Sequence, residues 1–228
     1  MSLREKVAIT GIGETDYSRA SGRSVIALQL DASRRAIEDA GLRPSDIDGI
    51  IPYSGGAVVA EDFITNFGIP DLRFSATTPM GGASGVAAVQ CAAAAIGAGI
   101  CNHVLIPIGR NGASGERIGA RVQQMPQFRV VGEFEMPLGA IAPVQLYAPM
   151  ARRHMELYGT TSRQFGEIAV STRANALLND RATMKKPMTI EDHQNSRMIS
   201  DPLRLLDCSL ESDGGCAIVV SSVERALR

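Results

Sequence analysis

Apolar and polar positions along the chain follow two different periods in turn, and this pattern predicts strands separated by helices. Short apolar runs bounded by glycine, proline or aspartate predict buried strands, and these runs are Val7–Ile12 and residues 46–55, 72–79, 103–109 and 215–222. Apolar residues at helical spacing predict helices between the strands, over Val25–Ala40, Ala60–Phe67 and Ala83–Gly99. Strands that alternate with helices indicate the α/β class, in which a mixed, mostly parallel sheet carries helices on its faces.

The helix expected over Ala83–Gly99 differs from the others because small apolar residues surround it. Its sequence, GVAAVQCAAAAIGAGI, contains almost no residue suited to water. A helix that is apolar on all sides is typically buried, and small side chains allow the layers on both sides to approach closely. We therefore expect this helix to be covered on both faces.

A long excursion separates the fourth predicted strand from the fifth, and it is too long for a plain crossover. Within it, residues 148–159 and 162–179 predict helices, and residues 188–196 predict one short helical turn. Thr161 and Gln164 fit a capping box at the start of the second helix, whose expected apolar face is Phe165, Ile168, Ala169, Thr172 and Ala176. We therefore expect residues 110–213 to form a helical loop domain inserted into an α/β domain made of residues 1–109 and 214–228.

Composition and charge exclude several functional classes. The chain has 228 residues, a formal net charge of −1 and 4% aromatic residues. Interspersed charges and few aromatic side chains argue against a nucleic-acid-binding surface. The longest apolar run is interrupted by Ser84 and Gln90 and falls short of the roughly 18 apolar residues that a membrane span needs. We expect neither a nucleic-acid partner nor a membrane span.

The cysteines and histidines predict no metal site. The four cysteines lack C-x-x-C spacing, and the three histidines are isolated from one another, whereas structural zinc sites use closely spaced ligands. The sequence MSLREK leads directly into an apolar strand, without the features of a secretory signal peptide. We therefore expect a cytoplasmic protein with reduced thiols.

Two glycine-rich stretches invite a nucleotide-binding interpretation, but both depart from the required motif. GIGETD has Asp16 where the dinucleotide fingerprint has its third glycine, which favours a tight turn. Residues 109–119, GRNGASGERIG, lack the G-K-[ST] ending of a phosphate-binding loop. This second stretch is either a loop without function or a flap beside a pocket, in which Arg110, Arg117 or Arg121 would meet an anionic ligand.

One segment carries a specific family resemblance. SRMISDPLRLLDCSLESDGG, residues 196–215, resembles the corresponding part of thiolases of the sterol-carrier-protein-x type, also described as lipid-transfer proteins. The likeness extends from VAITGIGETDYSR to SSVERA. It implies the N-terminal half of the thiolase fold, with a loop domain inserted into an α-β-α unit and a homodimer formed around the strand Phe74–Thr78. The resemblance further implies a C-terminal half, which we expect to be absent from this sequence.

The same resemblance locates a missing nucleophile. Thiolases of this type carry a turn similar to N-C-x-T-G, and the matching turn here is Gly81–Gly85, with Gly82 in the place of the cysteine. Glycine has no atom to acylate. Cys91 lies about 13 Å further along the helix and is expected in the core, and Ser84 lacks a base. The chain therefore resembles the cysteine-less subgroup, which implies retro-aldol cleavage of steroid side chains with an OB-fold, zinc-ribbon partner subunit.

From these features we expect a protein that cleaves a carbon–carbon bond of an acyl-CoA thioester in lipid or steroid side-chain degradation. The expected oxyanion donors are the backbone N–H groups of the helix N-terminus, namely Gly81, Gly82 and Ala83. The expected substrate-binding residues are Met80, Ser84, Arg110, Arg117, Tyr147 and Met150. No cofactor is expected beyond the coenzyme A of the substrate, and the base is expected in the C-terminal half. Two alternatives stay open: a non-catalytic acyl-CoA-binding or lipid-binding subunit, and a Claisen-type acyltransferase.

Overall fold

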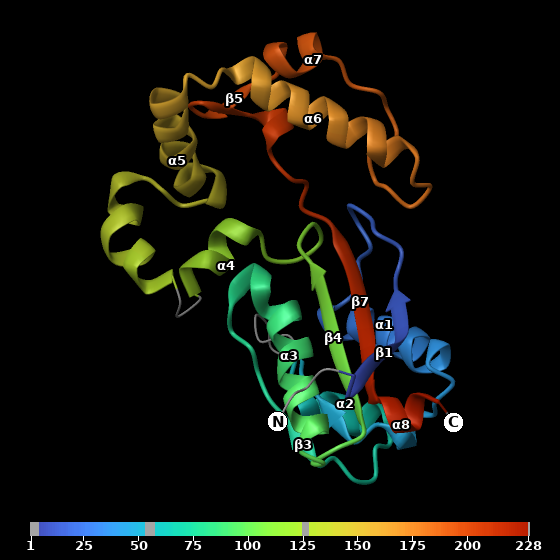
Figure 1. Cartoon of the computed structure of the whole chain (residues 1–228). Coiled ribbons are helices and arrows are strands. Elements are labelled where there is room, and N and C mark those ends of the chain that lie inside the picture. Colours follow the sequence, from blue (N-terminus) through green and yellow to red (C-terminus); the bar gives the residue numbers. More distant parts are fainter. Residues whose placement is uncertain (1–4, 53–57, 125–127, 228) are drawn as a thin grey trace. The chain divides into compact units, whose positions relative to one another are not determined.

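The computed structural model describes residues 5–52, 58–124 and 128–227 and divides the chain into two compact units (Figure 1). The sheet unit comprises Met1–Gly115 and Ser212–Arg228, and the helical unit comprises Glu116–Glu211. The boundaries between the units fall at residues 115/116 and 211/212, whereas the sequence predicted domain limits at 109/110 and 213/214. In the described residues, no helix is long and apolar enough to cross a membrane.

The sheet unit contains the five predicted strands and three principal helices. Its strands are β1 (Val7–Glu14), β2 (Gly49–Ile50), β3 (Phe74–Ser75), β4 (His103–Asn111) and β7 (Asp213–Ser222). Its helices are α1 (Val25–Asp39), α2 (Ala60–Phe67), α3 (Ser84–Gly97) and the short α8 (Val223–Ala226), with 3-10 turns η1 (Pro44–Asp46) and η2 (Gly81–Ala83). The strands β2 and β3 are shorter than predicted, and residues 53–55 of the second predicted strand lie outside the described residues.

The strands form one sheet in the order β1-β7-β4-β2-β3. The strand β2 is parallel to both β3 and β4, whereas β7 is antiparallel to β1 and β4. Four strands therefore share one direction and β7 alone is reversed, which confirms the mixed, mostly parallel sheet.

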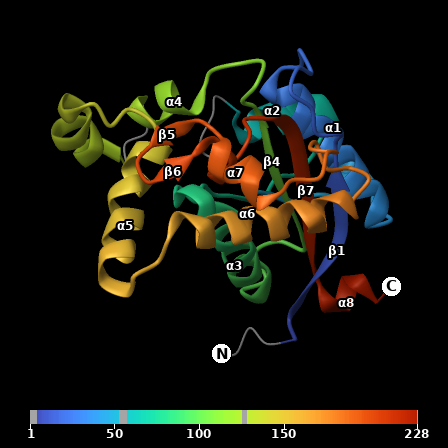
Figure 2. The ribbon, with the colours of Figure 1, turned by 90° about the horizontal axis from the view of Figure 1, so that it is seen from above.

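The sheet lies between helices, as the α-β-α prediction requires. The helices α1 and α2 cover one face and α3 covers the other (Figure 2). Successive residues of a strand point to opposite faces, so Leu105 of β4 joins the core around α1 and Phe63, whereas Val104 and Ile106 join the core around α3 and Val220.

The glycines of GIGETD serve packing, and the prediction of a tight turn there is wrong. Gly11 and Gly13 lie inside β1. A Cβ atom on either glycine would overlap the backbone of α1, at the carbonyl oxygens of Ala36 and Ala32. The two glycines therefore allow α1 to approach the sheet more closely than any side chain would permit.

The small, apolar helix α3 is buried along one side. Ala88, Ala92 and Ile96 pack against the sheet, whereas Val86 on the other side is 78% exposed. Within the described residues, the helix is therefore covered on one face rather than on both, and its outer face is an exposed apolar surface.

The helical unit contains more elements than the sequence predicted. Its elements are α4 (Ile118–Gln124), the π-helical turn η4 (Val131–Glu135), η5 (Met136–Leu138), α5 (Pro143–Tyr158), α6 (Ser162–Leu177), α7 (Ile190–Asn195), β5 (Met198–Ser200), β6 (Leu203–Arg204) and η6 (Leu205–Asp207).

Thr161 and Gln164 form the predicted capping box of α6. The expected apolar face of α6 is partly wrong, because Ile168 is 66% exposed and Gly166 instead packs on the buried ring of His193. His193 in turn bonds Asp207 at 2.7 Å.

A buried carboxylate at the start of β7 joins three segments of the sheet unit. Asp213 is fully buried and accepts hydrogen bonds from the backbone N–H groups of Ser21, Ala113 and Ser114 at 2.8–3.0 Å. The hydroxyls of Ser21 and Ser114 also donate to it. Burial disfavours the charged carboxylate, but the hydrogen bonds from Ser114 and Ser21 outweigh burial and hold the pKa of Asp213 well below its ordinary value.

We predict that Asp213→Asn lowers the free energy of unfolding by about 2 kcal/mol at pH 7, because an amide presents a donor to groups that are themselves donors. Since the pKa of Asp213 is lower in the folded state than in the unfolded state, its stabilising effect is present above about pH 4 and is lost as the pH falls. Urea denaturation should therefore show that the difference in the free energy of unfolding between Asp213→Asn and wild type becomes smaller as the pH is lowered from 5 to 3. Asp71→Asn, at an exposed ion pair with Arg73, is the control, and equal stability of Asp213→Asn and wild type at pH 7 would contradict the prediction.

Candidate functional site

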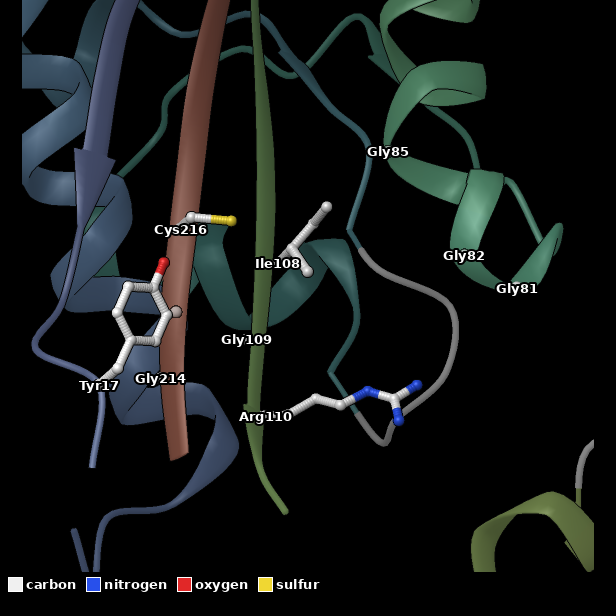
Figure 3. Close-up of a pocket in the computed structure, with 10 residues that line it drawn as sticks. Tyr17, Gly81, Gly82, Gly85, Ile108, Gly109, Arg110, Gly214 and Cys216 are labelled. Carbon is white, nitrogen blue, oxygen red and sulfur yellow. The ribbon is translucent and has the colours of Figure 1, made fainter. Parts of the chain in front are cut away.

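A cavity of about 330 Å³ lies in the sheet unit, where β4 ends and β7 begins beside the start of α3 (Figure 3). Because β4 and β7 are antiparallel, Gly109 and Arg110 of β4 pair with Gly215 and Gly214 of β7. The residues that line the cavity are Tyr17, Gly81, Gly82, Gly85, Ile108, Gly109, Arg110, Gly214, Gly215 and Cys216. Six of these ten residues are glycines, so much of the wall is backbone.

The three glycines that line the cavity at the start of α3 differ in what the fold requires of them. Gly81 has a φ of +58°, a conformation that side chains disfavour. A Cβ atom on Gly85 would lie 3.2 Å from Ile108, so this glycine serves close packing. Gly82 has neither constraint, because a Cβ atom there would meet nothing within 4 Å among the described residues. The described part of the fold therefore leaves room for a side chain at position 82, and Gly82 is one of the residues that line the cavity.

The backbone donors of this turn differ from those expected. The N–H of Ala83 donates to the carbonyl of Met80 at 3.2 Å, so the prediction that Ala83 offers a donor to the substrate is wrong. The N–H of Ser84 is likewise used, by the carbonyl of Gly81. Among the described residues, the N–H groups of Gly81 and Gly82 have no hydrogen-bond acceptor, and both glycines line the cavity.

Ser84 does not serve the expected substrate-binding role, because it is used inside the turn. It is 3% exposed, and its hydroxyl accepts the N–H of Met80 at 3.0 Å. Thr78 donates to the carbonyl of Ser84 at 3.0 Å. These bonds fix the path of the chain into α3. Met80 is exposed beside this turn but is not among the described residues that line the cavity.

The other expected substrate-binding residues are divided between the two units. Arg110 lines the cavity of the sheet unit. Arg117 lies in the helical unit and forms an ion pair with Glu211 at 2.6 Å, so its charge is already matched. Tyr147 and Met150 are exposed on α5, and Met150 lines a second cavity of about 620 Å³ that lies wholly within the helical unit.

Sequence reasoning missed Tyr17 and Cys216 as residues of the cavity. Burial raises the pKa of the Cys216 thiol, so the thiol is a weak nucleophile at neutral pH. Tyr17 is 39% exposed and stands at the β1 side of the cavity (Figure 3). Cys91, by contrast, is partly buried and packs against the core around α3, as predicted.

Sequence comparison finds no matching family model but finds clear relatives. The chain is 43% identical to the "Steroid side-chain-cleaving aldolase" of Thermomonospora curvata, over 96% of this chain and 57% of that protein. It is 41% identical to the "17-hydroxy-3-oxo-4-pregnene-20-carboxyl-CoA lyase" of Mycobacterium tuberculosis, over 98% of this chain and 59% of that protein. The chain thus spans less than two thirds of the length of these relatives.

Solved structures agree with the sequence relatives. The structure titled "Ltp2-ChsH2(DUF35) aldolase" superposes with a TM-score of 0.88 at 41% identity, covering 99% of this chain and 58% of that one. The "monomeric SCP2-thiolase like protein type 1" of Mycobacterium smegmatis has the same fold, with a TM-score of 0.71 at 21% identity, covering 99% of this chain and 47% of that one. The chain therefore has a thiolase-superfamily fold like that of the sterol-carrier-protein-2 type thiolases, which confirms the fold that the sequence resemblance implied.

Proposed function

We propose that the chain contributes its cavity to an enzyme that cleaves a carbon–carbon bond of a β-hydroxyacyl-CoA thioester by a retro-aldol reaction. The observation that carries this proposal is the open space at Gly82 among the described residues, together with the thiolase resemblance, which aligns Gly82 with the nucleophilic cysteine. The names of the relatives, an aldolase that cleaves steroid side chains and a lyase of a carboxyl-CoA compound, favour a steroid or a similar lipid as the substrate.

Retro-aldol cleavage needs a site for negative charge but no covalent intermediate. A base removes the proton of the β-hydroxyl, the bond between the α and β carbons breaks, and the β carbon leaves as a ketone or aldehyde. The electron pair of the broken bond passes into the thioester as an enolate, which then takes a proton at the α carbon. The N–H groups of Gly81 and Gly82 supply donors for the enolate oxygen, next to the positive end of the α3 dipole. We propose that the base lies in the part of the relatives' length to which this chain has no counterpart.

The proposal includes partners at two surfaces of the sheet unit. The strand β3 lies at the edge of the sheet, and an edge strand offers unpaired backbone groups to a second chain, so we propose a homodimer around Phe74–Thr78. The exposed face of α3 is proposed to pack against a second thiolase half. An OB-fold, zinc-ribbon subunit is proposed as a further partner, consistent with the two-protein title of the "Ltp2-ChsH2(DUF35) aldolase" structure.

The proposed reaction is tested by product analysis. We expect the full-length protein, with its partner subunit, to convert a β-hydroxyacyl-CoA into a ketone or aldehyde and a shortened acyl-CoA, both measured by mass spectrometry. Thiolysis of a β-ketoacyl-CoA that depends on free CoA, with no retro-aldol products, would contradict the proposal. Binding without turnover would favour a non-catalytic subunit, and a covalent acyl adduct on the protein would favour a Claisen-type acyltransferase.

Because the space at Gly82 is open, we expect a substitution there to reduce activity without changing stability. In Gly82→Ala, the added methyl group meets no described protein atom within 4 Å, so thermal unfolding should be unchanged, but it adds bulk at a residue that lines the cavity. We expect the kcat/KM for cleavage to fall by about tenfold or more. If the methyl group displaces the substrate, a rise of roughly 1.4 kcal/mol in the activation free energy is sufficient for a tenfold loss. Gly132→Ala adds a methyl group with its nearest neighbour 3.9 Å away and is the matched control. Unchanged cleavage by Gly82→Ala would refute the idea that the substrate uses this space.

A further inference from the structure

We propose that two side chains of α1 cover the outer edge of β1 and prevent a second copy of the chain from pairing with that strand. This inference goes beyond the proposed reaction and does not rest on it. Among the described strands, β1 pairs with β7 alone, so it forms one edge of the sheet (Figure 2). It spans eight residues and carries the exposed apolar side chains of Ile9 and Ile12. A long apolar edge is a template for unwanted strand pairing unless its backbone groups are covered.

Side chains of α1 bind the backbone groups that β1 directs away from β7. The carboxylate of Asp39 accepts the N–H of Ile12 at 2.8 Å. The guanidinium of Arg35 donates to the carbonyl of Glu14, also at 2.8 Å. Ile12 and Glu14 are two residues apart, so their backbone groups face the same side of the strand. The carboxylate and the guanidinium therefore take the places that a carbonyl and an N–H of an added strand would occupy.

The repeat of the helix matches the repeat of the strand. Arg35 and Asp39 are four residues apart, which is a rise of about 6 Å along α1. The two backbone groups that they bind belong to alternate residues of β1, which lie about 6.7 Å apart. A Cβ atom on either of the two glycines inside β1 would overlap the backbone of α1, so these glycines let the helix approach closely enough for both contacts.

Two further features complete the covered edge. The guanidinium of Arg35 also donates to the carboxylate of Asp31, at 3.0 and 3.3 Å, which holds it beside the strand. The helix ends at Asp39, and directly beyond this point β1 has a register shift at Thr10. A bulge of this kind disrupts the regular ladder that an added strand would need. Helix side chains thus protect one part of the edge, and the bulge protects the next.

The double variant Arg35→Ala/Asp39→Ala of the full-length protein tests this inference. We expect it to associate reversibly, so that its mass in sedimentation velocity rises by about twofold or more with concentration, because the uncovered edge can then pair with another copy. Arg34→Ala/Glu38→Ala is the matched control. It removes an exposed ion pair of 2.6 Å from the same helix, leaves both contacts with β1 intact and should keep the mass of wild type.

Hydrogen exchange, read by mass spectrometry on peptides that cover residues 7–14, locates the association. In the dilute double variant, we expect this segment to exchange faster than in wild type, by about fivefold at the amide that loses its acceptor. At concentrations at which the mass rises, exchange should become slow again, because an added strand supplies a new acceptor. Asp39→Asn keeps an oxygen that can accept the N–H of Ile12 and should behave as wild type does in both measurements.

Each outcome decides the proposal. Reversible association of a double variant that melts as wild type does, together with slower exchange of β1, supports it. An unchanged mass in a folded double variant would overturn it. Irreversible aggregation with a lower melting temperature would also overturn it, because the two side chains would then serve stability alone. If the double variant does not fold, Asp39→Ala by itself is judged by the same criteria. None of these measurements uses cleavage, so the retro-aldol proposal stands or fails separately.

Discussion

The cavity depends on the buried carboxylate of Asp213. A fully buried charge is stable only when hydrogen bonds replace its water, and here every donor comes from a chain segment that borders the site. Ser21 follows the segment of Tyr17, whereas Ala113 and Ser114 follow the end of β4. The carboxylate therefore holds two loops against the start of β7. Without it, the loops would lose their common acceptor, and the walls of the cavity would lose their relative positions.

Glycine shapes this site because it has no side chain, so the space that a Cβ atom would occupy is left for other groups. At Gly214 the space is taken by the ring of Tyr17, and at Gly85 the space is nearly filled by Ile108. At Gly82 the space is open. One residue type thus seats a side chain, permits close packing of a helix on a strand, and leaves open space at a position that lines the cavity. This difference can be recognised only from the neighbours of each glycine, because the sequence shows the same letter at all three positions.

Local patterns predicted the elements well, whereas long-range contacts decided the site. Apolar periodicity located α2, and the pair Thr161 and Gln164 located the start of α6, because those signals lie within a few adjacent residues. The role of Ser84 was predicted wrongly, since its burial and its bond to Met80 depend on how the turn folds. Tyr17 was not recognised as a cavity residue because its neighbours are distant in sequence. Its ring packs on Gly214 of β7, and the nearby hydrogen bond between Ser21 and Asp213 joins residues 192 positions apart. No local pattern in GETDYSR indicates that neighbour.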